Sequence, residues 1–332
     1  MAITLAEAKV GMADKVDQQI IDTFRRSSML LDMLTFDNSI SPGTGGSTLA
    51  YGYIQLKTPS TAAVRALNTE YTAGEAKREE KTAKAVIMGG SFEVDRVLQN
   101  TSGAVDELAF QAQQKIKATA NYFHNLVVNG TSAASGAGYV ANTFDGLRKA
   151  LTGTSNDFTT DIDLSDSTKL DSNANAFVDQ LDQLTHMVDG GASLLLMNTA
   201  MLLKVRAAAR RAGYYDRKKD DFGRAVEYFG DIPIMDAGMY YNGTKSVDVI
   251  DTSTPSTSAA GTSSIYAVNI ALDGFHGISP TGTGVINSYM PDLKAPGAVK
   301  KGEVELVAGV VLKNTLKAAA LNGIVLKAKT SV

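Results

Sequence analysis

The sequence predicts an α+β fold in which strand-patterned segments are combined with long amphipathic helices. Three observations support this class: a strand-like excursion over residues 49–97, an uninterrupted helical pattern over residues 102–129, and a strand-rich end after residue 265. The chain has 332 residues, of which 44% are hydrophobic and 20% charged. A chain of this size and composition is expected to be globular, with one large or two moderate domains.

The composition excludes several classes of site. The chain contains no cysteine, which rules out disulfides, thiolate metal sites and a cysteine nucleophile. Its formal net charge of -3 argues against a protein built mainly to neutralise DNA phosphates, but leaves room for local basic patches. The sequence lacks a signal peptide and any apolar run of the ~20 residues that a membrane-spanning helix needs. We therefore expect a chain made in the cytoplasm, with no membrane partner.

The N-terminal segment is expected to form an arm. Val16, Ile20 and Phe24 follow helical spacing, whereas residues 39–48, SISPGTGGST, have the composition of a loop. That loop would separate an arm, residues 1–48, from the rest of the chain.

The segment of residues 49–97 begins and ends with strand patterns. Tyr51 and Tyr53 alternate with smaller residues, and the residues around Phe92 alternate again on the return arm. Between the arms lies GEAKREEKTAK, residues 74–84, of which seven of eleven are charged, and no Asn-Gly turn closes a tight hairpin. We expect an extended β-loop with a charged, mobile outer half.

The loop carries charges of both signs, which favours an intermolecular contact. Such charges fix the orientation of two binding surfaces more than they increase the binding affinity. The alternative is a solvated loop that only improves solubility. The side chains predicted to contact a neighbouring molecule are Glu75, Lys77, Arg78, Glu79, Glu80, Lys81 and Lys84.

Residues 102–129 have the pattern of one long helix. Apolar residues, among them Ala112 and Phe123, recur every three or four positions. Ser102 is the expected N-cap, and the Asn-Gly pair at residues 129–130 is the expected stop. Residues 104–129 contain neither glycine nor proline, and at 1.5 Å per residue this part of the helix would be roughly 39 Å long. Its narrow, alanine-rich apolar face is typical of a strut.

The second half of the chain alternates between helix and strand patterns. A helix is predicted over residues 176–188, and Asn198 is the expected N-cap of a second helix that ends near residue 212. Residues 251–264 are polar and are expected to form a surface loop. Strands are predicted at residues 193–197, 225–229, 232–236, 265–270, 285–289, 303–313 and 318–327.

Candidate catalytic and metal-binding residues are scarce. His124, His186 and His276 have no partner at a known motif spacing, so a structural or surface role is expected for each. The loop GTGGST lacks the lysine of a phosphate-binding loop, and the aspartates of residues 157–166 do not have calcium-loop spacing. We expect no catalytic, cofactor-binding or metal-binding residue, and therefore no enzyme.

A second group of charges lies in the segment KVRAAARRAGYYDRKKDD. A charged surface at a subunit contact is the favoured interpretation, and base stacking of nucleic acid on Tyr214 and Tyr215 is the alternative. The basic residues concerned are Arg206, Arg210, Arg211 and Arg217.

The order of these elements resembles that of the major capsid proteins of tailed bacteriophages. Those proteins have the Hong Kong 97-type fold, which encapsulin shells share. The local markers are TFDGLRKAL after the long helix, VEYFGDIPIMDAG in the α/β region and LKAAALNGIVLKA near the end. The resemblance covers nearly the whole chain and depends on the order and spacing of the elements, since none of the markers is a sharp motif.

The resemblance implies a domain layout. It would consist of an N-terminal arm (1–48), an extended β-loop over a neighbouring subunit (49–97), a peripheral domain (98–153 and 265–316) with a spine helix at 102–129, and an axial domain (154–264 and 317–332).

The resemblance also implies a function. The chain would assemble through pentamers and hexamers into an icosahedral phage head around double-stranded DNA, bound without sequence specificity. A separate scaffolding protein and a portal would be further partners, and the chain would enter the virion after assembly in the bacterial cytoplasm. The four arginines named above would lie at the inner face or at capsomer contacts. No partner asparagine for a lysine crosslink is identifiable, so no crosslink is expected.

Two other functions are alternatives. An encapsulin-like compartment would use the same fold to enclose enzyme cargo, bound through a short peptide. A cytoplasmic α/β enzyme would need a site that the sequence does not display.

Overall fold

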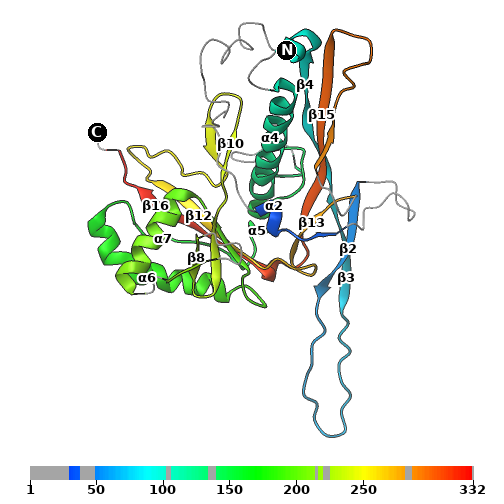
Figure 1. Ribbon diagram of the computed structural model, residues 1–332. Helices are drawn as coiled ribbons and strands as arrows, with labels where there is room; N and C mark the ends of the chain where they lie inside the picture. The colour runs from blue at the N-terminus through cyan, green and yellow to red at the C-terminus, as the bar shows by residue number, and fades with distance from the viewer. Residues whose placement is uncertain are drawn as a thin grey trace.

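The computed structural model of the chain describes residues 30–37, 49–101, 106–133, 140–213, 216–219, 225–280 and 286–330. These residues form two large sheets, helices packed on them, and a long hairpin that projects from the body (Figure 1). The architecture is α+β, as the sequence predicts. None of the described helices is long and apolar enough to cross a membrane.

The first sheet, which we call the body sheet, is built around β15 (Val299–Leu312). All residues of β4 (Val86–Asp95) pair antiparallel with β15, over its residues 299–308. β14 (Ile286–Tyr289) and β13 (Phe275–Ile278) also pair antiparallel with β15, and β1 (Phe36–Asp37) pairs parallel with β13. The sequence predicts β14 and most of β15 but misses β13, because DGFHGIS is rich in glycine and has no apolar alternation.

α4 (Glu107–Asn129) packs on one face of the body sheet and begins later than predicted. Asp106, not Ser102, is its N-cap, because the Asp106 carboxylate accepts a hydrogen bond from the Ala109 N–H and a negative charge favours the positive end of the helix. A short helix, α3 (Arg96–Thr101), precedes it, and Ser102 lies outside the described residues. With 23 residues, α4 is roughly 34 Å long.

The second sheet has seven strands in the order β5-β16-β12-β6-β9-β8-β7. Its strands are β5 (Asp157–Thr159), β16 (Ala318–Lys327), β12 (Gly261–Val268), β6 (Leu194–Met197), β9 (Ile232–Asp236), β8 (Ala225–Phe229) and β7 (Asp216–Lys219). The predictions for β6, β8, β9 and β16 are confirmed to within a residue. β12 begins inside the segment predicted to be a loop, where Gly261 pairs with Lys327.

Both faces of the seven-stranded sheet are buried. Leu195 and Met197 face α6 (Ser167–His186) and α7 (Thr199–Ala212), whereas Leu194 and Leu196 belong to the core formed with α4. The prediction that Asn198 caps α7 is confirmed. α6 begins nine residues earlier than predicted, because Asp166 caps it by accepting a hydrogen bond from the Lys169 N–H.

Several short elements complete the body. They are α2 (Leu30–Met33), α5 (Leu147–Leu151), β10 (Met239–Tyr241), β11 (Ser246–Asp248) and the 3-10 helix η1 (Thr315–Lys317). Leu30, within the segment predicted as an arm, is fully buried in the core with α4. The rest of that segment, residues 1–29 and 38–48, lies outside the described residues.

The projecting hairpin consists of β2 (Ala50–Thr58) and β3 (Lys77–Lys84), paired antiparallel. The predicted return arm is wrong: the residues around Phe92 lie in β4 of the body sheet, and the charged segment predicted as the outer half forms β3 itself. Every side chain of β3 except Ala83 is exposed, so this strand needs no apolar alternation. The end of the hairpin is instead residues 59–76, which we call the tip.

Candidate functional site: the projecting hairpin

The hairpin extends far beyond the body of the molecule (Figure 1). Every residue from 56 to 82 is exposed, including Leu56 on β2 and the aliphatic residues of the tip. An isolated two-stranded hairpin is marginally stable in water, and exposed apolar side chains mark interaction surfaces when they gather in one place. The hairpin therefore has the properties of a segment that another molecule covers.

The tip is held in shape by its own contacts. The Thr69 N–H and hydroxyl both donate to the Ala66 carbonyl, at 3.3 and 2.8 Å. The Arg65 guanidinium donates to the Thr69 carbonyl and lies 5.5 Å from the centre of the Tyr71 ring. Val64 and Leu67 remain 101% and 89% exposed, so the turn buries neither side chain. The tip thus presents two aliphatic side chains on an ordered turn, which lowers the entropy cost of binding.

The base of the hairpin is fastened to the body by one tyrosine and one glutamine. The Tyr51 hydroxyl donates to the Asp37 carboxylate at 2.9 Å, and the Tyr51 ring lies edge-on to the His276 ring, 6.0 Å between centres. The Lys313 ammonium lies 5.2 Å from the centre of the Tyr51 ring, and Gln55 donates to the Lys313 carbonyl at 2.9 Å. These contacts tie β2 to β1, β13 and the end of β15.

The charges around Tyr51 favour this arrangement. Burial, the hydrogen bond to Asp37 and the charge of that carboxylate raise the pKa of Tyr51 to about 12, so the phenol stays a donor at neutral pH. Burial and the nearby Lys313 lower the pKa of His276, which favours the neutral ring. The backbone of Gly274 acts in the opposite direction on the pKa of His276, but less strongly than burial and Lys313. His276 therefore packs as a neutral aromatic ring against the hairpin base.

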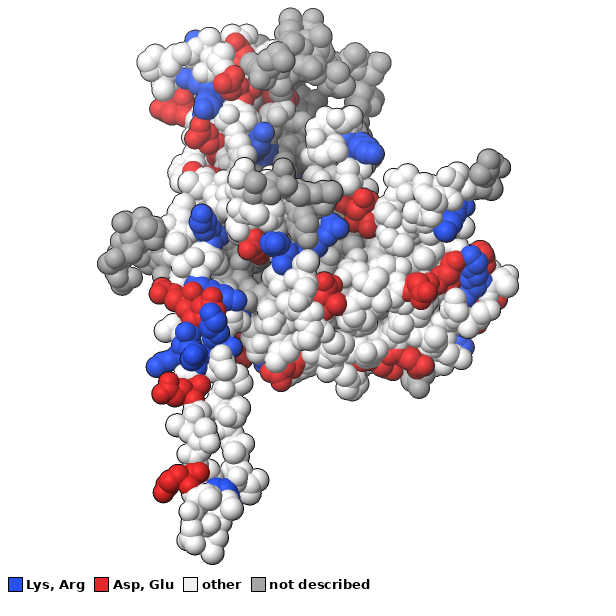
Figure 2. Space-filling model, turned by 180° about the vertical axis from the view of Figure 1, so that it is seen from behind, with Lys and Arg blue, Asp and Glu red and all other residues white. Residues whose placement is uncertain are grey.

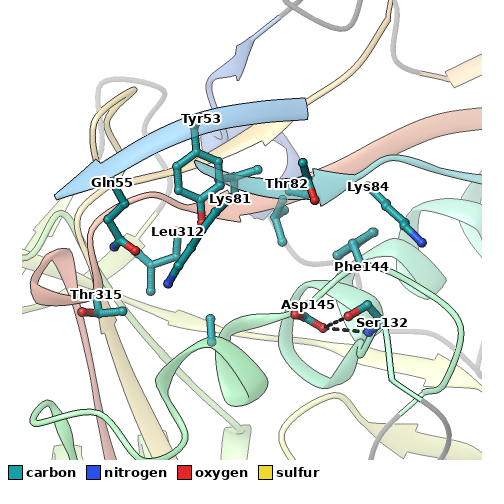
Figure 3. Close-up of a pocket in the computed structure, with 14 residues that line it drawn as sticks. Tyr53, Gln55, Lys81, Thr82, Lys84, Ser132, Phe144, Asp145, Leu312 and Thr315 are labelled. Carbon is teal, nitrogen blue, oxygen red and sulfur yellow. Dashed lines mark hydrogen bonds between the residues drawn. The ribbon is translucent and has the colours of Figure 1, made fainter. Parts of the chain in front are cut away.

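A pocket of about 450 Å³ lies beside these contacts, between the hairpin and the body (Figure 3). Tyr53 and Lys81 line it from the hairpin, and Leu312 and Asp145 line it from the body. The Asp145 carboxylate accepts hydrogen bonds from the backbone N–H and hydroxyl of Ser132, at 2.7 and 2.8 Å. Beside this space, the hairpin packs on Ile278 and Val311 of the body through Tyr51, with Tyr53 and Ala83 next to it.

The predicted contact residues lie together on the hairpin. Lys77, Arg78, Glu79, Glu80, Lys81 and Lys84 are all on β3, and Glu75 is in the tip. Glu79 forms an ion pair with Lys57 of β2 at 3.4 Å. The other charged side chains of β3 form no ion pair within the described residues. Their contact with a neighbouring molecule stays a prediction.

The predicted arginine group is divided by the structure. Arg206 pairs with Glu227 of β8, and Arg211 pairs with Asp171 of α6, so both hold α7 against its neighbours. Arg210 is exposed at the end of α7. The Arg217 side chain lies outside the described part of the chain. Ion pairs within the chain therefore explain Arg206 and Arg211, and neither residue needs a second molecule to balance its charge.

The described residues offer no assembled metal site. They contain no group of three or more His, Asp or Glu side chains placed to hold a metal ion. Three of the four aspartates of residues 157–166 have structural roles: Asp157 accepts from Asn322, Asp163 pairs with Lys169, and Asp166 caps α6.

Comparison with known proteins identifies the fold. No protein-family model matches the sequence, and no curated protein matches it. Solved structures do match it over nearly the whole length, and three of them serve as examples. In the holo-SrpI encapsulin complex from Synechococcus elongatus PCC 7942, the matched chain is 12% identical with a TM-score of 0.65, and the match covers 100% of this chain and 99% of that chain.

The other two structures come from bacteriophages. A chain of Mycobacterium phage Bobi is 14% identical with a TM-score of 0.59, covering 98% of this chain and 99% of that chain. A chain from the capsid of Myoviridae phage XM1 is 12% identical with a TM-score of 0.53, covering 97% and 99%. At such identities the likeness carries the fold and not the function. This protein therefore has the Hong Kong 97-type fold that phage capsid proteins and encapsulins share.

Proposed function

We propose that this chain is the major capsid protein of a tailed bacteriophage, which assembles through pentamers and hexamers into an icosahedral head around double-stranded DNA. The observation that carries this proposal is the projecting hairpin, whose exposed aliphatic and charged side chains have no partner surface nearby in the described part of their own chain. The capsid-type fold supports it, because the solved chains that share this fold include that of a phage capsid.

A shell of this kind follows from repeated head-to-tail contacts. A hairpin that contacts a different surface on the next copy makes a heterologous contact, and such contacts close into rings when the rotation between copies allows it. Covering a side chain such as Val64 or Leu67 would contribute about 1.5–3 kcal/mol each. Many such contacts acting together produce a stable shell from weak pairs.

The same fold suggests which parts of the chain would form each domain of the shell subunit. The hairpin of residues 50–84 would lie over a neighbour, and β4, which pairs with β15, would belong with the peripheral domain of 98–153 and 265–316. The axial domain would comprise 154–264 and 317–332. The chain would perform no chemistry. A separate scaffolding protein and a portal would assist assembly in the bacterial cytoplasm, and Arg210 would lie at the inner face or at a capsomer contact.

An encapsulin-like compartment is the second candidate. The observation that favours it is the TM-score of 0.65 with the SrpI encapsulin chain, against 0.59 and 0.53 for the two phage chains above. The contents of purified particles distinguish the two candidates: packaged nucleic acid supports the phage head, and a single enclosed enzyme supports the compartment.

Negative-stain electron microscopy of the full chain tests the proposal. The chain would be imaged alone and after coexpression with a scaffold candidate. Closed shells, or rings of five and six subunits, are expected. A uniform monomer or dimer under both conditions would contradict the proposal and favour the cytoplasmic enzyme.

A further inference from the structure

The chain contains three Asn-Gly pairs, and the fold places them in three different environments. The pairs are residues 129–130 at the end of α4, residues 242–243 between β10 and β11, and residues 322–323 within β16. An asparagine that precedes glycine is chemically vulnerable, because glycine has no side chain to keep its backbone nitrogen away from the asparagine side chain. The local structure therefore decides which of the three pairs can react.

The reaction open to such a pair is the loss of ammonia. The glycine nitrogen gives its proton to hydroxide, and its electron pair attacks Cγ of the asparagine, which places a negative charge on Oδ1. The Cγ–Nδ2 bond then breaks, and Nδ2 leaves as ammonia after taking a proton from water. Water opens the remaining cyclic imide at either carbonyl and yields aspartate or isoaspartate. A reactive pair therefore needs a free glycine N–H, a free Nδ2 and hydrogen-bond donors at Oδ1.

The turn between β10 and β11 meets all three requirements. Oδ1 of Asn242 accepts hydrogen bonds from the backbone N–H groups of Thr244 and Lys245, both at 3.0 Å. These donors point at the atom on which the negative charge forms, as the donors of an oxyanion hole do. Neither the Gly243 N–H nor Nδ2 of Asn242 forms a hydrogen bond within the described residues.

The same turn is both ordered and open to water. The Asn242 N–H donates to the Lys245 carbonyl at 3.1 Å, and Tyr241 pairs with Ser246. Gly243 has a φ of 93°, and no other described part of the chain lies within 4 Å of the position that a Cβ would occupy. The turn lies at the end of the strand pair that points away from the seven-stranded sheet (Figure 1). Hydroxide and water can therefore reach both reacting groups.

Hydrogen bonds hold the reacting groups of the other two pairs. Nδ2 of Asn129 donates to the Val249 carbonyl at 2.7 Å, and the Gly130 N–H donates to the last turn of α4 at 2.9 Å. Nδ2 of Asn322 donates to the Asp157 carboxylate at 2.6 Å. The side chains of these two asparagines must break their contacts before ammonia can leave, whereas that of Asn242 need not.

We propose that Asn242 is a site of spontaneous modification, at which attack by the Gly243 nitrogen converts the side-chain amide into a carboxylate. The inference goes beyond the proposed function and does not depend on it, because a single chain suffices. Figure 2 shows charged side chains of the body in small groups of both signs, so one added carboxylate changes the local charge of the surface. The isoaspartate product also adds a carbon atom to the backbone of the turn.

Peptide mass spectrometry of the full chain tests the site. The purified chain is incubated in mildly alkaline buffer, once folded and once unfolded in guanidinium chloride, and is then digested at acidic pH, where the reaction is slow. Replacement of the amide nitrogen by oxygen raises the mass of the peptide concerned. Two variants probe the donors: Thr244→Pro removes one of the two N–H groups, and Thr244→Ala keeps both. Thermal melting by circular dichroism checks that each variant folds.

All three pairs should react at similar rates in the unfolded chain, because they share the same dipeptide. In the folded chain, Asn242 should react at least as fast as when unfolded, and Asn129 and Asn322 about tenfold or more slower, because hydrogen bonds hold their reacting groups. Thr244→Pro should slow the reaction of Asn242 severalfold in the folded chain only, and Thr244→Ala should leave it unchanged. A folded Asn242 as slow as Asn129 and Asn322 would overturn the proposal. Equal folded rates in the two variants would overturn the role of the N–H donors.

Discussion

At the residue scale, His124 couples the stability of the fold to pH. Its side chain is buried on α4, and burial lowers its pKa from 6.5 to about 4. The folded state therefore binds fewer protons than the unfolded state between these values, so stability is complete above pH 6.5 and is lost as the pH falls toward 4. The loss should reach about 3 kcal/mol at pH 4. Urea unfolding of the unassembled chain at a series of pH values measures it.

His124→Gln should flatten this dependence in part. His276, whose pKa burial also lowers, retains a share of it. The exposed His186 provides the matched control, since His186→Gln removes a histidine that is not buried. An unchanged pH dependence in His124→Gln would contradict the assignment.

Asn198 gives a second prediction at this scale. Its side chain accepts a hydrogen bond from the Met201 N–H at 2.8 Å and donates to the Ile250 carbonyl at 2.9 Å, and the residue is 1% exposed. Asn198→Ala removes the cap of α7 and leaves buried polar groups unpaired, so a loss of roughly 2–4 kcal/mol is expected. Asn175→Ala, at an exposed position of α6, should change stability by less than about 0.5 kcal/mol. Equal stability of both variants would contradict this role.

Caps and buried strands are the features that single residues could predict. Asn198 stands directly between a buried strand and a helical pattern, so its role was readable. The role of Asp106 was not readable, because serine is an equally good N-cap at residue 102. Which of the two residues caps α4 depends on where α3 ends. The position of His276 beside Tyr51 was also unreadable, since 225 residues of chain separate the two.

At the element scale, the tip separates assembly from folding. Residues 59–76 are all exposed, so replacing them with an Asn-Gly turn between Thr58 and Lys77 should change the stability of the monomer by less than about 1 kcal/mol. The same replacement should abolish particle formation, because the turn that presents Val64 and Leu67 is lost. Thermal melting and sedimentation measure the two effects.

Smaller changes in the tip locate the contact. Val64→Ser with Leu67→Ser keeps the length of the hairpin and should weaken assembly. Ser60→Ala with Thr72→Ala, equally exposed in the tip, should not. A chain without its tip that still forms normal particles would show that the tip has no part in the contact.

The hairpin is also the element that the sequence predicted least well. Tyr51 and Tyr53 indicated β2 correctly, because one face of β2 packs on the body. β3 has no buried face, so its charged residues looked like a loop although they pair with β2 over the whole strand. The sequence singled out these charged residues but not their place on a strand, and their contact with a neighbouring molecule stays a prediction.

At the scale of the whole molecule, assembly should be sensitive to salt, because the proposed contact between copies involves the exposed charges of β3. Raising the ionic strength from about 0.1 to 1 M shortens the Debye length from about 10 to about 3 Å. The initial rate of assembly, followed by light scattering, should fall about tenfold or more, because opposite charges speed the encounter of the two surfaces. Lys77→Gln with Arg78→Gln should reduce this sensitivity. A rate that does not change with salt would contradict a contact between copies through the charges of β3.

The fold as a whole was predictable because the order of its elements is distinctive. A long excursion, a long helix, an α/β region and a strand-rich end all occur in the order that the sequence indicates. The pairing of β4 with β15 was not predictable, because about 200 residues separate the partners and strand patterns do not specify their neighbour.

The central claim is that copies of this chain close into rings and shells through the hairpin, and the mass of the particles tests it most directly. Mass photometry of the purified full chain, alone and after coexpression with a scaffold candidate, resolves species that are whole multiples of 35.0 kDa. We expect species of five and six subunits together with much larger closed particles. A single species of one or two subunits at every protein concentration, with and without the scaffold candidate, would contradict the account.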